Sequence, residues 1–285
     1  MFPLVRLASL GLLAAASDPS RPTFDCSTDT KHASDDFLQA IKSLHGGSNS
    51  GSPAARAALA SRDGTTGPIA VDAVFHIVST NDKKSSVTND MPNSQIDALN
   101  KAYAPYDISF NLINVTWTTN DAWAVGQKAD DDEMKKSLRQ GSYRTLNLYF
   151  QTDLTDGVLG HPTVYFNDGC NINAQTMPGG PMNGYNAGMT AVHETGHWMG
   201  LLHTFEGYSC DGPGDYIDDT PVEKEATDGC PTSPAKRSCP DQQKADESDS
   251  IHKYMDYSID SCYEGFTALQ VDRMRSMWGM YRAGN

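Results

Sequence analysis

Positive charge is scarce in this sequence. It contains 22 Lys and Arg against 36 Asp and Glu, which gives a formal net charge of −14. A protein that binds DNA or RNA needs a basic surface to neutralise phosphates, and these few basic residues do not form an obvious one. The composition therefore argues against a nucleic-acid partner and is typical of a soluble chain.

The sequence also lacks an apolar run of the roughly 20 residues that a membrane-spanning helix needs. Its first residues, MFPLVRLASLGLLAAAS, combine one arginine, a short apolar run and small residues that fit a cleavage site. This layout is typical of a signal peptide, which we place at residues 1–16. We expect a secreted, extracellular protein with no membrane partner.

Cysteines are few, six in all, and none forms a CxxC pair. This absence argues against a zinc ribbon, and in a secreted chain six cysteines indicate disulfides. Four of them follow residue 203, in chain rich in Gly, Pro and Asp that cannot hold itself by core packing: Cys210, Cys230, Cys239 and Cys262. The sequence alone permits three pairings of these four.

The most informative stretch is Met189–His203, MTAVHETGHWMGLLH, which contains the pattern HExxHxxGxxH. On a helix, His193 and His197 lie one turn apart on the same face and can bind one ion, whereas Glu194 points elsewhere. Asn186 is the expected N-cap of this helix.

A turn in the same stretch supplies a third ligand. Gly200 stands where a left-handed residue would end the helix and swing His203 back toward the ion. Three neutral imidazoles, with the fourth position left to water, are typical of catalytic rather than structural Zn²⁺. We predict one catalytic zinc ion.

Further along the chain, Lys253–Ser258 reads KYMDYS. A methionine in a tight turn after HExxHxxGxxH resembles the metzincin clan of zinc peptidases. HETGHWMGLLHTFEG, the cysteines that follow it and YMDYS resemble most the pappalysin family, in its small secreted fungal branch, over about Val71–Arg282. The resemblance implies an α/β (α+β) metzincin-like fold: a mixed twisted sheet with helices above a cleft, and an irregular, disulfide-tied lower subdomain that ends in a helix.

Roles for individual residues follow from this resemblance. Glu194 would be the general base, Met255 a structural plug under the imidazoles, and Tyr257 a catalytic residue whose hydroxyl stabilises the oxyanion. The alternative for Tyr257 is a core tyrosine. Relatives that prefer a basic residue after the cut bond carry an acid where Ser261 stands here, with Asp260 beside it, so the sequence does not predict that preference.

The resemblance also implies the disulfide pairing and a second metal. It joins the downstream cysteines in an interleaved way, Cys210 with Cys239 and Cys230 with Cys262. Carboxylates crowd the segment DGPGDYIDDT, and secreted relatives bind calcium near it. The expected Ca²⁺ ligands are Asp215, Asp218, Asp219 and Thr220; the alternative is a solvated acidic loop.

The remaining chain alternates strand and helix patterns. We expect strands over 71–79, 108–116, 144–151 and 157–166, helices over 35–44, 93–103, 131–139 and 267–281, and a loop over 167–185. The predicted divisions are a signal peptide (1–16), a leader or pro-segment (17–67) and a catalytic domain (68–285), whose upper and lower parts are 68–203 and 204–285.

Two cysteines are left over, Cys26 in the leader and Cys170. Either they form a disulfide, or the Cys26 thiolate is a fourth zinc ligand that silences a zymogen. Ser27 stands where such a switch usually has glycine, which favours the disulfide. In both cases cleavage near Arg62 would release the catalytic domain. Separately, Asn114 begins the only N-glycosylation sequon, NVT, and must lie exposed if it is modified.

These features predict a secreted, monomeric zinc endopeptidase that cleaves protein or peptide substrates. Two other classes stay open: an inactive zinc-binding effector or adhesin of the same fold, and a zinc hydrolase acting on small amides. The intact Glu194 argues against the first, because binding a metal does not require that carboxylate.

Overall fold

The computed structural model describes residues 35–49, 67–154, 160–163 and 168–284. The predicted signal peptide and Cys26 lie outside these residues. Within them, no helix has the length and apolar character that crossing a membrane requires.

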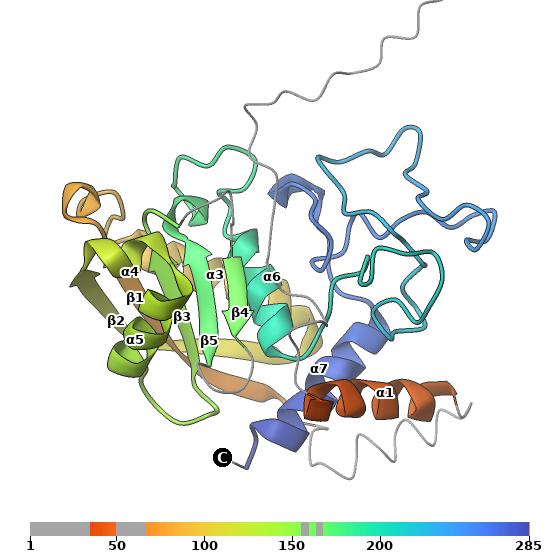
Figure 1. The fold of residues 1–285 in the computed structure, drawn as a ribbon, viewed down its shortest axis with the longest axis horizontal. Coiled ribbons are helices and arrows are strands. Elements are labelled where there is room, and N and C mark those ends of the chain that lie inside the picture. Colours follow the sequence, from red (N-terminus) through yellow and green to blue (C-terminus); the bar gives the residue numbers. More distant parts are fainter. Residues whose placement is uncertain (1–34, 50–66, 155–159, 164–167, 285) are drawn as a thin grey trace, which may run out of the picture.

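A five-stranded sheet organises the upper part of the molecule (Figure 1). Its order is β2-β1-β3-β5-β4, and every neighbouring pair is parallel except β4 and β5, which are antiparallel. The sheet is therefore mixed, as predicted. The strands are β1 (Ile69–Ser79), β2 (Ile108–Thr119), β3 (Leu146–Gln151), β4 (Gly160–Thr163) and β5 (Gly169–Asn173).

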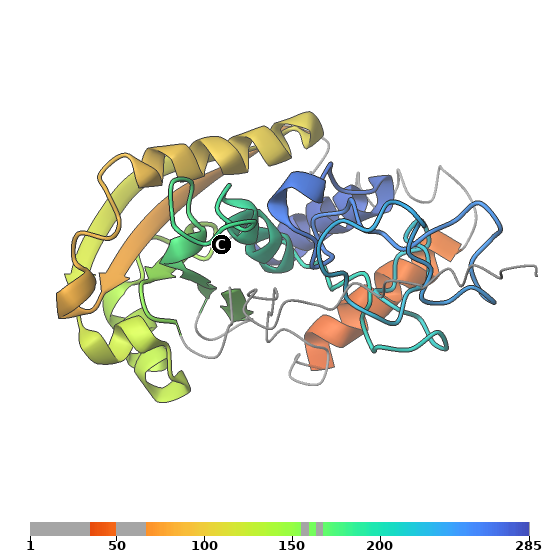
Figure 2. The same ribbon diagram turned by 90° about the horizontal axis from the view of Figure 1, so that it is seen from above.

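Helices cover both faces of this sheet (Figure 2). Helix α3 (Met91–Tyr103) and the central helix α6 (Met189–Trp198) lie on one face, and α4 (Asp121–Val125) and α5 (Lys128–Leu138) lie on the other. Parallel strands need such crossovers, which bury both faces and explain the β-branched and aromatic strand sequences. The described residues also form four short 3₁₀ helices: Asn81–Lys83, Ala104–Tyr106, Ala174–Thr176 and Asp260–Cys262.

The main core fills the space between the sheet and the α3 and α6 helices. Phe75 and Ile77 on β1 are buried there with Tyr103 of α3 and Val192 of α6. The Tyr103 hydroxyl donates a hydrogen bond to the Val192 carbonyl oxygen at 2.9 Å. Because both ends of this contact are buried, it holds α6 against α3.

Three predicted elements differ from the structure. Strand β5 lies in the segment expected to be a loop, because its polar sequence GCNIN is buried on both sides within the sheet. Helix α4 was not predicted, because its five residues carry no periodic signal. The strand expected at 157–166 is described only at β4, and the rest of that segment lies outside the described residues.

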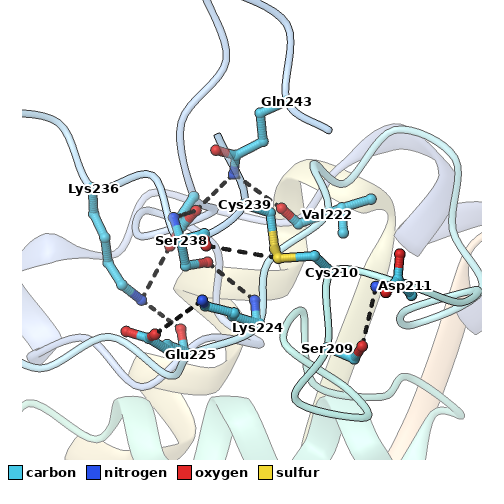
Figure 3. The surroundings of a disulfide bond; sticks show 11 residues. Ser209, Cys210, Asp211, Val222, Lys224, Glu225, Lys236, Ser238, Cys239 and Gln243 are labelled. Atoms are coloured by element: carbon cyan, nitrogen blue, oxygen red, sulfur yellow. Dashed lines mark hydrogen bonds and ion pairs between the residues drawn. A yellow bond between two sulfur atoms is a disulfide. The ribbon is translucent and has the colours of Figure 1, made fainter. Parts of the chain in front are cut away.

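Residues 204–259 form the irregular lower part, where the described chain contains loops and isolated bridges only. Two disulfides crosslink it, Cys210–Cys239 and Cys230–Cys262, over sequence separations of 29 and 32 residues. This is the predicted pairing. Figure 3 shows the first disulfide among polar loop contacts, such as the hydrogen bond from the Lys224 amide to the Ser238 hydroxyl. Each crosslink stabilises the fold by roughly 3 to 4 kcal/mol in the chain-entropy model.

Two further helices cross below the loops of residues 204–259, at the bottom right of Figure 1. Helix α7 (Ala268–Tyr281) begins at Thr267, which forms a capping box with Gln270. Helix α1 (Asp35–Asn49) comes from the predicted leader and packs against α7.

Candidate metal centre

Helix α6 carries the HExxH pattern through the middle of the molecule, and the residues from Thr190 to Trp198 are buried. Its N-cap is Gly188, with a φ of 86°, and not Asn186 as predicted. The Asn186 side chain instead donates to the Gly180 carbonyl oxygen at 2.7 Å. The short polar side chain near the helix start is used to hold the preceding loop.

A side chain distant in sequence covers the start of α6 in its place. The Asp260 carboxylate accepts a hydrogen bond from the Ala187 amide at 2.6 Å. Burial raises the pKa of this carboxyl to about 6, although the hydrogen bonds from the Ala187 and Met189 amides oppose the shift. From the sequence, Asp260 is named only as the neighbour of Ser261, in connection with substrate preference. The hydrogen bond with the Ala187 amide was missed because the two segments are 73 positions apart in the sequence.

Helix α6 ends at a left-handed Gly200, as predicted. Gly200 has a φ of 95°, its amide donates to the His197 carbonyl oxygen at 2.8 Å, and the Leu201 amide donates to the Gly196 carbonyl oxygen at 3.0 Å. This pair of bonds is a Schellman motif, which satisfies the last carbonyls of the helix. The turn also returns the Leu201 carbonyl oxygen to His197 Nδ1, 2.9 Å away.

Three histidine nitrogens converge beyond this turn. Nε2 of His197 lies 3.0 Å from Nε2 of His193 and 3.1 Å from Nε2 of His203. The Nδ1 atoms of His193 and His197 face the carbonyl oxygens of Tyr254 and Leu201, so these nitrogens carry the protons. The Nε2 lone pairs are therefore left facing one another.

Electrostatics keeps these imidazoles neutral. Burial lowers the pKa of His193 and His203 well below the usual value and that of His197 to about 4. The converging lone pairs of three neutral rings repel one another unless a cation lies between them. A tetrahedral Zn²⁺ at 2.0 to 2.1 Å from each nitrogen would separate the nitrogens by about 3.3 Å, so the trio fits this ion.

A tight turn closes the floor of the centre. The Asp256 amide donates to the Lys253 carbonyl oxygen at 3.1 Å, and Met255 in this turn is fully buried. A Cβ on Gly196 would lie 2.5 Å from the Met255 sulfur, so the turn packs directly under α6. The Thr204 amide donates to the Met255 carbonyl oxygen at 3.1 Å and links the turn to the residue after His203.

Two more of the predicted residues lie beside the histidines. Glu194 is fully buried on α6. The Tyr257 ring centroid lies 5.7 Å from that of His193 and 5.0 Å from that of His203, and the ring also contacts Phe205. The structure thus brings Tyr257 against the histidines and Met255 under α6, and Glu194 is buried on that same helix.

Comparison with known proteins agrees with this arrangement. A family model for M43 peptidases, described as pregnancy-associated plasma protein-A, matches residues 128–278. The chain belongs to the M43 peptidase family. It is thus a metalloendopeptidase, and the predicted resemblance to pappalysins is confirmed.

Curated relatives of this M43 peptidase include fungal enzymes. It is 42% identical to an extracellular metalloprotease of Neurospora crassa, over 99% of this chain and 97% of that protein. It is 45% identical to an extracellular metalloprotease of Aspergillus fumigatus, over 76% of this chain and 78% of that protein.

Solved structures with a similar fold include mirolysin of Tannerella forsythia in two forms. The precursor, promirolysin, superimposes with a TM-score of 0.69 at 23% identity and covers 90% of this chain and 94% of its own. Mature mirolysin in complex with a cleaved peptide gives 0.64 at 25% identity and covers 76% of this chain and 97% of its own. The metzincin-like fold is confirmed.

In the M43 peptidase, Cys170 is a free, fully buried thiol on β5, so the predicted Cys26–Cys170 disulfide is not formed in this structure. Its sulfur donates to the Glu194 carbonyl oxygen at 3.4 Å, and burial raises the pKa of the thiol well above its usual value. Cys170 therefore acts as a small core residue between β5 and α6.

The predicted calcium ligands do not converge. Asp218 lies 3.0 Å from His45 Nε2, and Asp219 accepts hydrogen bonds at the start of α7 from the Thr267 hydroxyl and the Leu269 amide. Asp215 is buried and accepts from the Ile217 amide and the Thr220 hydroxyl. Among the described residues, only the histidine trio and the group Cys230, His252 and Cys262, which contains a disulfide, bring three metal-type ligands together. Calcium at this loop stays a prediction.

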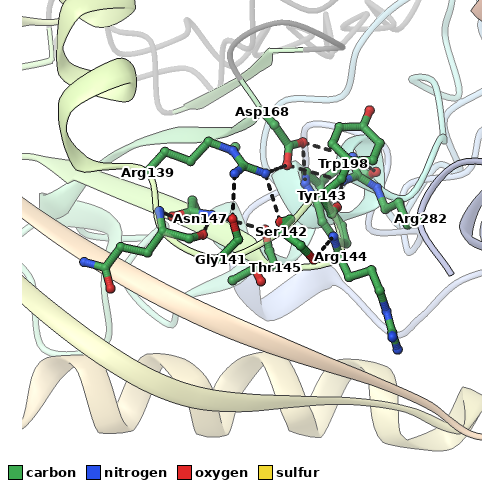
Figure 4. A network of polar contacts seen from close by, with 12 residues as sticks. Arg139, Gly141, Ser142, Tyr143, Arg144, Thr145, Asn147, Asp168, Trp198 and Arg282 are labelled. Atoms are coloured by element: carbon green, nitrogen blue, oxygen red, sulfur yellow. Dashed lines mark hydrogen bonds and ion pairs between the residues drawn. The ribbon is translucent and has the colours of Figure 1, made fainter. Parts of the chain in front are cut away.

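A second polar cluster joins the end of α6 to the rest of the enzyme (Figure 4). Asp168 accepts hydrogen bonds from Trp198 Nε1 at 2.9 Å and from Arg282 Nη2 at 3.1 Å. The Arg282 guanidinium also lies 3.5 Å from the Trp198 ring centroid and donates to the Trp198 carbonyl oxygen. Sequence reasoning missed this cluster, because nothing local connects residue 168 with residue 282.

Proposed function

We propose that this chain is the precursor of a secreted zinc endopeptidase in which Glu194 is the general base. The observation that carries the proposal is the convergence of three neutral histidine nitrogens, two of them from the same buried helix that bears Glu194. Relatives named extracellular metalloproteases and the signal-peptide pattern of residues 1–16 support secretion.

His193, His197 and His203 would hold the zinc ion. Zn²⁺ supplies Lewis acidity, which makes water more acidic and polarises the substrate carbonyl. The Glu194 carboxylate would accept a proton from the attacking water and deliver it to the departing amine. Tyr257, packed against two of the ligands, would donate a hydrogen bond to the developing oxyanion.

Strand β4 is the structural basis for binding an extended peptide. It forms the end of the described sheet beyond β5, so one side of its backbone has no neighbouring strand there, and it contacts α6. A substrate strand could pair with this edge through main-chain hydrogen bonds that do not depend on side-chain identity. An endopeptidase with protein substrates needs this kind of recognition, whereas a hydrolase of small amides does not.

The division into leader and catalytic domain is part of the proposal. Residues 68–285 are 218 of 285 residues, or 76%, which is the share covered by mature mirolysin, whereas promirolysin covers 90%. In the full chain the zinc ligands are at most 4% exposed and Glu194 is not exposed at all. We infer that cleavage near Arg62 converts this precursor into the active enzyme.

A cleavage assay tests this function. Processed enzyme is incubated with casein or gelatin, with and without a zinc chelator, and beside it with small amide substrates. The proposal expects protein cleavage that stops with chelator and returns with added zinc. An inactive effector would cleave nothing, and a small-amide hydrolase would cleave only the small substrates.

A further inference from the structure

Strand β2 is an unusual edge strand. It ends the described sheet on the side opposite β4 and pairs with β1 only. It is 12 residues long, ISFNLINVTWTT, and none of them is charged, proline or glycine, although 20% of the whole chain is charged. Edge strands normally carry lysine, proline or short lengths that stop another strand from pairing with them.

A β-bulge interrupts this edge at its middle. Ala73 pairs with Leu112 and Val74 pairs with Asn114, so Ile113 is an extra residue with no partner on β1. Ile113 is 50% exposed, the largest exposure of any apolar residue on the strand, and Asn114 beside it is also exposed. The bulge twists the strand but leaves an apolar side chain in solvent.

Asn114 is also the acceptor position of the NVT sequon. Its side chain lies at the surface and donates a hydrogen bond of 2.9 Å to the exposed Gln140 side chain. Thr116, the third sequon residue, pairs with His76 on β1, and its hydroxyl lies 2.7 Å from His76 Nδ1. A sugar on Asn114 would therefore project into solvent from the bulge and leave the contact of Thr116 intact.

We propose that Asn114 carries an N-linked glycan that covers Ile113 and the free edge of β2, and that this glycan prevents β2 from pairing with the same strand of a second copy. The glycan would block strand pairing at this edge, as charged residues and proline do on other edge strands. A hydrophilic branched sugar next to the bulge keeps an approaching strand beyond the 4.7–4.9 Å spacing that pairing requires. This inference is independent of the catalytic proposal.

Expression in a secreting eukaryotic host tests both parts. Intact-mass analysis and peptide mapping of the wild-type chain are expected to show a glycan on Asn114. Asn114→Gln removes the acceptor but keeps an amide for Gln140, and its matched control Thr116→Ser keeps the sequon and a hydroxyl for His76. Sedimentation velocity over a concentration series is expected to show monomers for wild type and Thr116→Ser, and concentration-dependent self-association for Asn114→Gln.

The double variant Asn114→Gln with Ile113→Lys places a charge on the uncovered edge and is expected to return the chain to monomers. A monomeric double variant would show that the Asn114→Gln substitution permits folding and that its self-association occurs at the β2 edge. An unmodified Asn114 in the wild-type chain overturns the proposal. The proposal is also overturned if Asn114→Gln stays monomeric over the whole concentration range in which the wild type is monomeric. It is overturned as well if Ile113→Lys does not reverse the self-association of Asn114→Gln.

Discussion

At the scale of single residues, Gly196 shows how closely the metal centre is packed. It lies on α6, where alanine would ordinarily be more stable than glycine by about 1 kcal/mol. A Cβ there would instead lie 2.5 Å from the Met255 sulfur. We expect Gly196→Ala to lower the free energy of unfolding by about 1–3 kcal/mol, measured by urea denaturation of zinc-loaded protein. In a double-mutant cycle with Met255→Ala, the two losses should sum to more than the loss of the double variant, because the clash is then gone. A Gly196→Ala variant as stable as wild type would refute this packing.

Asp260 makes the stability of the fold depend on pH. Its pKa of about 6 in the folded state lies above the unfolded value near 3.8, because burial disfavours the charge. Between about pH 4 and pH 6 the folded state therefore holds a proton that the unfolded state has lost, so this residue's contribution is lost as pH rises through that window. The magnitude is roughly 2–3 kcal/mol.

We expect Asp260→Asn to remove this component. The difference in unfolding free energy between wild type and the variant should shift in favour of the variant by that amount from pH 4 to pH 7. Taking the difference cancels the titration of the histidines, which both proteins share. Asp241→Asn, at an exposed position, is the control. Identical pH profiles for wild type and Asp260→Asn would contradict the assignment.

At the scale of elements, the end of α6 depends on the end of α7. Arg282 pairs with Asp168, whose side chain is 4% exposed, and stacks on Trp198, the last residue of α6. Removing the guanidinium leaves a buried carboxylate whose only remaining cationic partner is the more exposed Arg139, beside the neutral Trp198 Nε1 donor. We expect Arg282→Ala to lower the free energy of unfolding by about 3 kcal/mol.

Arg282→Lys separates charge from shape. Lysine keeps the charge near Asp168 but cannot lie flat on the Trp198 ring, so its loss should be intermediate. Asp168→Asn should reduce the additional loss caused by Arg282→Ala, because the unpaired charge is gone. Additive losses in a double-mutant cycle would mean that the two side chains do not interact.

The elements also show what local sequence can and cannot predict. The helix around His193, the left-handed Gly200 and the capped α7 follow from spacing and local turn chemistry, and they are where the sequence predicts them. Strand β5 was missed because its neighbours in the sheet, and not its own polar residues, make it a strand. The Asp260 cap was missed for the same reason, since it depends on a contact between distant segments.

At the scale of the whole molecule, α1 connects the leader with the catalytic part. Phe37, Ile41 and Leu44 are buried against Leu202 and Met277, and Leu202 immediately precedes the zinc ligand His203. This contact is apolar. We expect α1 to stay bound to the catalytic part after cleavage near Arg62, so that both fragments co-elute in size-exclusion chromatography.

A pair of variants on adjacent positions of α1 tests that contact. Ile41→Asp buries a charge at the interface and should release the leader fragment after cleavage. Lys42→Asp, on the exposed side of the same helix, should leave it bound. Co-elution of the Ile41→Asp fragment would show that α1 is not what holds the leader.

The central claim is that Glu194 moves the proton at a three-histidine zinc site. The most direct measurement compares zinc content and casein turnover of processed wild type and Glu194→Gln, with Glu133→Gln, an exposed glutamate on α5 across the sheet from α6, as the control. We predict one zinc per chain and an unchanged melting temperature for Glu194→Gln, with turnover lower by several orders of magnitude, because the base is missing but the ligands are not. Turnover of Glu194→Gln near the wild-type rate at full zinc occupancy would contradict the mechanism.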